Sequence, residues 1–243
     1  MHNLSSGMPI YQSLAKSIAE KISSGEWPTG TVLPSETALA AEWRVSVGTM
    51  RRALSELTSE GLLARRRKTG TVVTGRPPRQ NLRFYFQYFR LHGRDGTLQN
   101  SLTKVLHAVG RPATPAEATK LAIEVGGAVI EIHRLRIVKG RRVMHETLVI
   151  AAGLVPGIDL APEAIPERLY SALWEVWGQK IAAIREEISA EVATPEDCRL
   201  LDLAPPAAVL VISEIAYDEQ ARPLLLNCHR ANTAQDVYIN EIQ

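Results

Sequence analysis

Residues 27–74 decide the fold of the first part of this chain. They begin Trp27-Pro-Thr-Gly-Thr-Val-Leu-Pro-Ser-Glu36 and continue through an apolar-periodic run to Trp43. They then read Val45-Ser-Val-Gly-Thr-Met-Arg-Arg-Ala-Leu54 and Glu60-Gly-Leu-Leu-Ala-Arg-Arg-Arg-Lys68-Thr-Gly-Thr-Val-Val73. The pattern predicts two short helices followed by a basic two-stranded wing, an arrangement that is typical of proteins placing a helix end and a loop against a DNA duplex.

Capping residues and apolar spacing set the limits of the predicted helices. An apolar residue recurs every fourth position over 10–23, which predicts a first helix that is closed by Gly25. Ser35 is placed to cap a second helix. We expect its inward face to be formed by Ala38, Leu39 and Trp43. Ser46 is placed to cap a third helix that Gly61 ends, and its predicted buried stripe consists of Val47, Met50, Leu54 and Leu57.

The wing is predicted as a hairpin of residues 62–67 and 71–74, with Lys68-Thr69-Gly70 at its tip. Charge is unevenly distributed along the chain. Residues 1–78 hold 10 Lys/Arg and 6 Asp/Glu, a net +4, whereas residues 79–243 hold 18 and 20, a net −2. Half of the ten cations lie in two clusters, at 51–52 and 65–67. Local positive charge suits phosphate contact, because neutralising phosphates releases counterions. A small helical module that binds protein would not explain basic residues at both the helix and the wing.

These residues resemble the GntR family of bacterial transcription regulators over roughly 10–74. The segments that carry the resemblance are Ile10–Gln12, Gly25–Gly30, Leu33–Glu36, Val45-Ser46, Thr49–Arg51, Ala53-Leu54, Glu60–Leu63 and Gly70-Thr71. The chain has Thr37 and Val47 where the family usually has Arg, and Lys68 where the wing tip is usually Gly. The resemblance implies a winged helix-turn-helix domain over 1–75. The DNA-binding residues we expect are Ser35, Thr37, Ser46, Val47, Gly48, Thr49, Arg51, Arg52, Arg67, Lys68, Thr69 and Gly70.

A Pro-rich connector over 76–82 is the predicted boundary with a second domain over 83–243. That domain contains an internal repeat, because Thr114-Pro115 recurs as Thr194-Pro195 at an offset of 80. Each copy reads as a capped short helix, a strand, a polar turn and a second strand. Two related units of this kind predict one antiparallel sheet with helices packed against it, so the whole chain is of the α+β class.

One strand of the first copy carries Arg134 and Arg136 on the same face, because side chains alternate along a strand. Glu146 lies on an otherwise apolar face of the next strand. Two guanidinium groups and a carboxylate suit an anion that also offers hydrogen-bond donors. The same pattern also fits an ordinary salt bridge at the end of a strand. His133 and His145 alternate onto the opposite face, where we expect a structural role.

Residues 82–243 resemble the UTRA effector-binding domain of the HutC subfamily, whose fold is similar to that of chorismate lyase. The segments that carry this resemblance are Ile132–Arg136, Gly140, Glu146, Leu169–Leu173, Leu201–Leu203, Tyr217-Asp218 and Arg222-Pro223. It implies an effector site, with Arg168 where relatives usually have Ser and Leu225 where they often have Glu. Those two departures favour a more anionic and less hydroxylated ligand than a sugar phosphate. The implied effector-binding residues are Arg134, Arg136, Glu146, Arg168, Tyr170 and Leu225.

The sequence therefore predicts a ligand-responsive bacterial transcription regulator that acts as a repressor. Its expected partners are a two-fold DNA operator, a small anionic effector and a second copy of the chain. The six histidines and two cysteines have no metal-ligand spacing, and no nucleophile–base pair stands out. We expect no catalytic residue, no metal and no cofactor. With neither a signal peptide nor a membrane-length apolar run, a cytoplasmic location is expected. The alternatives are an enzyme of chorismate lyase-like fold and an interaction module without a small ligand.

Overall fold

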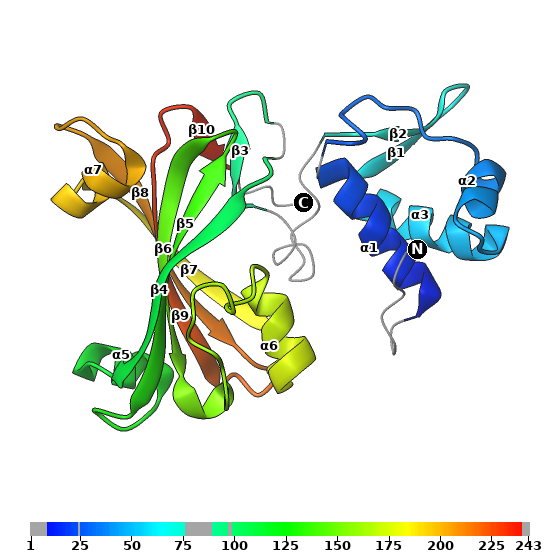
Figure 1. The fold of residues 1–243 in the computed structure, drawn as a ribbon. Helices are drawn as coiled ribbons and strands as arrows, with labels where there is room; N and C mark the ends of the chain where they lie inside the picture. The colour runs from blue at the N-terminus through cyan, green and yellow to red at the C-terminus, as the bar shows by residue number, and fades with distance from the viewer. Residues whose placement is uncertain (1–8, 24, 76–88, 97–98, 240–243) are drawn as a thin grey trace. The chain divides into compact units, whose positions relative to one another are not determined.

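The computed structural model describes residues 9–75 apart from 24, then 89–96 and 99–239. These residues form two compact units, one built mainly on 9–75 and the other on 101–236 (Figure 1). The connector predicted over 76–82 lies outside the described residues. In the described part of the chain, no helix is both long and apolar enough to cross a membrane.

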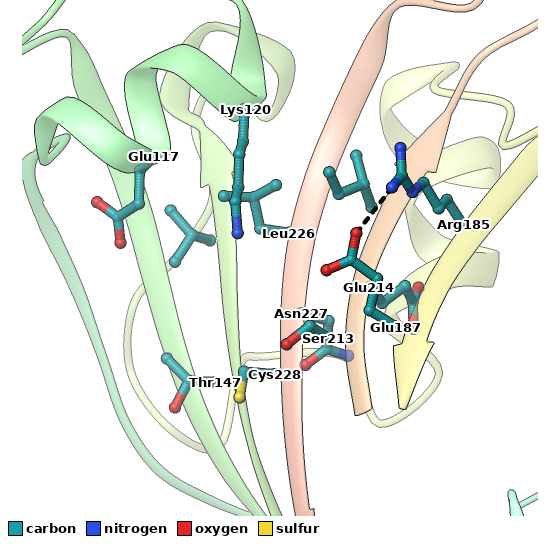
Figure 2. Close-up of a pocket in the computed structure, with 12 residues that line it drawn as sticks. Glu117, Lys120, Thr147, Arg185, Glu187, Ser213, Glu214, Leu226, Asn227 and Cys228 are labelled. Atoms are coloured by element: carbon teal, nitrogen blue, oxygen red, sulfur yellow. Dashed lines mark hydrogen bonds and ion pairs between the residues drawn. The ribbon is translucent and has the colours of Figure 1, made fainter. Parts of the chain in front are cut away.

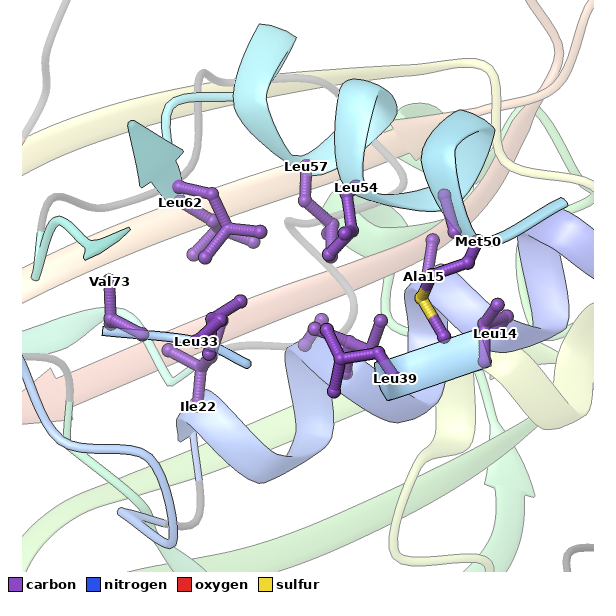
Figure 3. Close-up of a cluster of buried hydrophobic side chains, with 14 of the residues drawn as sticks. Leu14, Ala15, Ile22, Leu33, Leu39, Met50, Leu54, Leu57, Leu62 and Val73 are labelled. Carbon is purple, nitrogen blue, oxygen red and sulfur yellow. The ribbon is translucent and has the colours of Figure 1, made fainter. Parts of the chain in front are cut away.

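The first unit consists of three helices and a hairpin. Its elements are α1 (Ile10–Ser23), α2 (Glu36–Glu42), α3 (Val47–Ser59), β1 (Leu63–Arg66) and β2 (Gly70–Val73). The apolar residues spaced four apart in α1 face those of α3, and Leu39 of α2 closes the core between them (Figure 3). Leu39, Met50 and Leu57 are fully buried, so the predicted helical faces are largely confirmed.

Three positions of those faces were predicted wrongly. Ile10 is 53% exposed, since it is the first residue of α1. Ala38 is exposed and Ala40 is buried in its place, because Ala38 lies in the first turn of α2, before the residues that meet the core. Val47 is 37% exposed, since it is the first residue of α3 and precedes the turn that meets the core. The tip of the wing is also displaced by one residue, to 67–69, because Arg66 pairs with Gly70.

The second unit is built on one antiparallel sheet of six strands in the order β4-β5-β6-β9-β8-β7. The strands are β4 (Leu102–Pro112), β5 (Ala128–Val138), β6 (Arg141–Ala151), β7 (Ala183–Val192), β8 (Ala208–Tyr217) and β9 (Pro223–Ala231). The helices are α5 (Pro115–Leu121), α6 (Leu169–Trp177) and α7 (Pro195–Leu201), and a 3-10 turn, η1 (Ala152–Leu154), follows β6. A separate two-stranded sheet pairs β3 (Leu91–Gly93) with β10 (Asp236–Tyr238).

The predicted duplication is present and each copy is longer than expected by one strand. Both short helices begin with a capping box, formed by Thr114 with Glu117 in α5 and by Thr194 with Asp197 in α7. The copies are β4-α5-β5-β6 and β7-α7-β8-β9, and they join at the β6–β9 pair in the middle of the sheet. An edge strand therefore precedes each capped helix. Figure 1 shows α5 and α7 on one side of the sheet and α6 on the other.

Strand register relates the two copies residue by residue. Arg134 pairs with Glu146 in the first copy, and Glu214 pairs with Asn227 in the second. The offset is 80 residues from β5 to β8 and 81 from β6 to β9, so Glu214 lies at the position of Arg134. Both pairs therefore face the same side of the sheet.

Trp174 and Trp177 of α6 are not core residues. Trp174 is 54% exposed, and Trp177 is half-buried with its indole N–H donating to the Pro156 carbonyl at 3.1 Å. Leu169, Ala172 and Leu173 form the buried face of α6 instead. The helix has only nine residues, so its single buried stripe leaves the opposite positions in solvent.

Candidate functional site

The amino end of α3 is the centre of the first candidate surface. Ser46 caps this helix, its hydroxyl accepting from the Thr49 N–H at 3.0 Å and lying 2.8 Å from the Thr49 hydroxyl. Val47 and Gly48 are exposed next to the cap. A Cβ added to Gly48 would meet only the Ser46 hydroxyl, at 3.8 Å. The helix start is therefore a narrow exposed edge with backbone N–H groups at its tip, which suits close approach to a nucleic-acid groove.

Glu36 connects this helix to the wing. Its carboxylate accepts from Arg51 Nε of α3 and from Arg65 Nη2 of β1, each at 2.7 Å. The side chains of Arg51 and Arg65 are 64% and 55% exposed, while that of Glu36 is 24% exposed. One carboxylate at the start of α2 therefore holds two exposed guanidinium groups from different elements. Sequence reasoning missed this role, because the three residues lie far apart in the chain.

The other basic residues predicted to bind DNA divide into two kinds. Arg52 lies with its guanidinium carbon 3.9 Å from the centre of the Tyr11 ring, a cation–π contact that directs it towards α1. Arg67 and Lys68 are exposed at the tip of the wing. Lys68 adopts a left-handed φ of 72°, a conformation that glycine adopts most easily.

Ser35 and Thr37 complete the predicted surface at the start of α2. Ser35 accepts from the Ala38 N–H at 3.2 Å, and its hydroxyl lies 2.9 Å from that of Thr37. Both residues are exposed. The predicted residues of the helix-turn-helix thus lie at two capped helix starts, and those of the wing at its tip.

The second candidate site is a buried polar cluster on the face of the sheet covered by α6. Arg134 and Glu146 face each other across β5 and β6, with Arg134 Nη2 2.7 Å from Glu146 Oε1, and both are almost fully buried. Arg136 Nε donates to the same oxygen at 2.9 Å, but its side chain is 21% exposed. Burial raises the pKa of Glu146, and the two neighbouring guanidinium groups outweigh that effect and hold the pKa well below its usual value.

The cluster continues onto the second copy through residues that the sequence had not indicated. His229 Nδ1 lies 3.0 Å from Glu146 Oε2 without the geometry of a hydrogen bond, and His229 Nε2 lies 3.1 Å from Glu214 Oε2. Tyr170 of α6 donates from its hydroxyl to Glu214 at 2.7 Å and accepts from Asn227 at 3.2 Å. The repeat offset, which equates Glu214 with Arg134, was the signal that could have found it.

Three polar atoms of this cluster are buried without a hydrogen-bond partner among the described residues. One is His229 Nδ1, which lies against Glu146 Oε2. The others are Arg134 Nε and Asn227 Oδ1, one donor and one acceptor. An unmet buried polar group is costly, so a bound molecule with both an acceptor and a donor would stabilise the cluster. Leu225, also predicted for this site, is fully buried on the same face as Asn227, whereas Arg168 is exposed at the start of α6.

His133 and His145 lie on the opposite face, as predicted, where they belong to a chain of buried polar contacts. His133 Nε2 lies 3.1 Å from His145 Nδ1, and His145 Nε2 lies 2.7 Å from Asp197 of α7. Arg230 donates to both oxygens of Asp197, at 2.8 and 2.9 Å. The His107 ring meets His133 edge-on at 5.3 Å. This histidine chain, comprising His107, His133, His145, Asp197 and Arg230, fastens α7 to the sheet.

In the part of the chain that the structure describes, no group of three acidic, histidine or cysteine side chains could hold a metal ion. Cys198 and Cys228 are free thiols and both are half-buried.

Comparison with known proteins gives the same division of the chain. Residues 10–73 match the family described as bacterial regulatory proteins, gntR family, and residues 99–234 match the UTRA domain. The HTH-type transcriptional repressor STM4068 of Salmonella typhimurium is 25% identical over 86% of this chain and 85% of its own length. The HTH-type transcriptional regulator GgaR of Escherichia coli is 26% identical over 96% of this chain and 91% of its own length.

Solved structures share the fold. The crystal structure of the possible transcriptional regulator YydK from Bacillus subtilis superposes with a TM-score of 0.65, at 21% identity, over 97% of this chain and 100% of that one. PhnF from Mycobacterium smegmatis superposes with a TM-score of 0.55, at 18% identity, over 94% of this chain and 99% of that one.

Proposed function

Because the chain belongs to the UTRA-containing part of the gntR family of bacterial regulatory proteins, we propose that it is a homodimeric repressor of the HutC type that a small anionic metabolite controls. The coarser function follows from the family: the chain is a DNA-binding, ligand-responsive transcription regulator. The proposal adds four points to this function: that the protein is a dimer, that its operator is two-fold, that it represses transcription, and that its effector is a small anion.

The proposed DNA contact is made by the start of α3 and the tip of the wing. Arg51, held by Glu36 one turn into α3, reads base edges, while Lys68 reaches phosphate or the minor groove. Two copies of this surface in a dimer would meet two half-sites, so the operator is a two-fold sequence. We place this contact in the cytoplasm, where the chain would meet its operator.

The proposed effector site is the α6-covered polar cluster, and one observation carries it. Arg134 Nε and Asn227 Oδ1 are buried with no partner among the described residues, which is what a site prepared for a ligand would leave. Arg136 and Arg168 supply the exposed positive charge. The salt-bridge alternative also has support, because Arg134 and Arg136 both pair with Glu146, at 2.7 and 2.9 Å.

Effector control requires that the ligand bind one arrangement of the DNA-binding units better than another, since only differential affinity shifts an equilibrium. We propose no catalytic step, because the relatives are named as regulators. Recovery of a chemically altered ligand after incubation with the protein would instead favour the enzyme alternative.

The test compares Arg136→Ala with Arg142→Ala, a change to an exposed arginine on β6 outside the cluster. The ligand is first identified by native mass spectrometry of the purified protein, and the operator by selection from a random duplex pool. Loss of one or two charge-assisted hydrogen bonds, each about 1.5–3 kcal/mol, should weaken ligand binding roughly tenfold or more in Arg136→Ala. Operator affinity without ligand should be unchanged. If Arg136→Ala binds the ligand as Arg142→Ala does, Arg136 has a structural role and does not bind the effector.

A further inference from the structure

A groove on the other face of the second unit's sheet is not used by either proposed contact. It has a volume of about 220 Å³ and lies between α5 and the strands from β6 to β7, with Lys120 of α5 on one wall and Arg185 of β7 on the other (Figure 2). Thr147, Ser213 and Cys228 line it. These residues alternate along their strands with Glu146, Glu214 and His229, so the groove opens away from the α6-covered cluster.

The duplication explains how the groove beside α5 arises. By register, Ser213 lies at the position of His133, and Leu226 at that of His145. Val149 likewise takes the position of Arg230. In one copy these places are filled by the histidine chain, which fastens α7 over β6. In the other copy, smaller and apolar side chains leave the space beside α5 open.

The lining of the groove combines an apolar floor with one available positive charge. Val149, Ile215 and Leu226 supply the apolar part. Glu117 is neutralised by Arg111, with two contacts of 2.8 and 2.6 Å, and Glu187 lies 2.9 Å from Arg185. Lys120 extends from α5 into the groove above Leu226 (Figure 2).

The deeper part of the groove is partly withdrawn from water. Burial raises the pKa of the Cys228 thiol, as expected of a floor with reduced solvation. For scale, an apolar protein cavity of about 150 Å³ holds a benzene molecule. A groove of about 220 Å³ therefore has room for a ring or short branched chain together with one carboxylate.

We propose that this groove is a second small-molecule site, which binds a monoanion with a compact apolar body. The carboxylate lies beside Lys120, and the hydrocarbon part lies on Val149, Ile215 and Leu226. Thr147 and Ser213 offer hydroxyl groups at the boundary between the two parts. Glu214 and Asn227 of the α6-covered cluster also line the groove, but the proposed ligand contacts lie on the opposite face of the sheet. The proposal holds whether or not that cluster binds the effector.

The probe is 4-fluorobenzoate, with neutral 4-fluorobenzamide as its uncharged counterpart, observed by ¹⁹F NMR against the full chain. The benzoate should bind more tightly than the amide by up to about fivefold, the effect of one solvent-exposed ion pair. Lys120→Met should remove that preference. Lys104→Met, which removes an exposed lysine from the edge strand β4, should leave it intact.

Ser213→His tests the location, because it installs in the groove the side chain that fills the equivalent place in the other copy. It should abolish binding of both probes. Ser213→His protein that binds 4-fluorobenzoate as the unmodified chain does, or equal affinity for benzoate and benzamide, would overturn the proposal. Should Ser213→His fail to fold, Lys120→Met decides the question alone, since Lys120 is exposed on α5 and its replacement leaves the core untouched.

Discussion

Removing the charge of Glu36 should loosen the sequence discrimination of the DNA-binding surface while strengthening its general attraction for DNA. Glu36 holds Arg51 and Arg65, each at 2.7 Å. Exposed pairs of this kind contribute about 0.2–1 kcal/mol each, so Glu36→Gln should cost at most about 2 kcal/mol of folding stability. The two freed guanidinium groups can then pair with phosphates. Arg51 meanwhile loses the contact that orients it towards base edges.

Counterion release sets the size of the change in the salt dependence of DNA binding. Two added phosphate contacts should steepen the slope of log affinity against log salt by about 1.8, at roughly 0.9 per contact. The assay is fluorescence anisotropy with the selected operator and a scrambled duplex, at several salt concentrations between about 50 and 200 mM. Glu36→Gln should bind the scrambled duplex more tightly and show a smaller ratio of operator to scrambled affinity.

The matched control is Glu42→Gln, which removes the same charge from an exposed position at the end of the same helix. It should change the slope and the specificity ratio little. If Glu36→Gln and Glu42→Gln behave alike, the reasoning that Glu36 orients Arg51 and Arg65 is refuted, and only the net charge of the unit matters.

Three further outcomes are expected. Binding to the operator should fall on the order of 10³–10⁵ between about 50 and 200 mM salt if a dimer contacts 6–10 phosphates, and a flat titration would contradict the winged-helix contact. Arg51→Ala should cost about 1–3 kcal/mol and relax sequence preference, whereas Lys68→Ala should weaken all duplexes evenly; equal loss of specificity would be the contrary result. Burial and then the neighbouring His145 and His107 lower the pKa of His133, so the unfolded chain takes up the proton first as pH falls. The free energy of unfolding should therefore decrease as the pH falls below ~6.5, by at most about 1.4 kcal/mol per pH unit for this group. Urea titrations at several pH values should show a smaller decrease for His133→Gln.

Much of the fold could be predicted because local chemistry decides it. Ser35 and Ser46 cap their helices as expected, and both Thr-Pro segments form capping boxes. These signals depend on residues within four positions of each other, which a sequence displays directly. The errors at Ile10, Ala38 and Val47 arose at the first turns of helices, whose side chains precede the part of the helix that packs on the core.

The edge strands β4 and β7 were missed for a related reason. Most positions of β7 are exposed or half-exposed, so its sequence lacks the apolar alternation that a half-buried strand displays. β7 belongs to the sheet because it pairs with β8, and this pairing cannot be predicted from the sequence of β7 alone.

The candidate effector site could be predicted only in part. Arg134 and Glu146 lie on adjacent strands of one hairpin, so alternation alone brought them together. Glu214 and His229 come from the other copy, and they reach Glu146 and Tyr170 only because β6 pairs with β9. A contact across the centre of the sheet depends on the topology, and the repeat predicted the two copies without predicting how they join.

Operator affinity measured with and without the endogenous ligand, on the full chain, tests the central claim most directly. Coupling between effector and operator sites is typically 1–3 kcal/mol, so the dissociation constant for the operator should change about 5- to 150-fold when the ligand saturates the protein. Affinity for a scrambled duplex should change much less. An operator dissociation constant that is the same with and without saturating ligand would contradict the account.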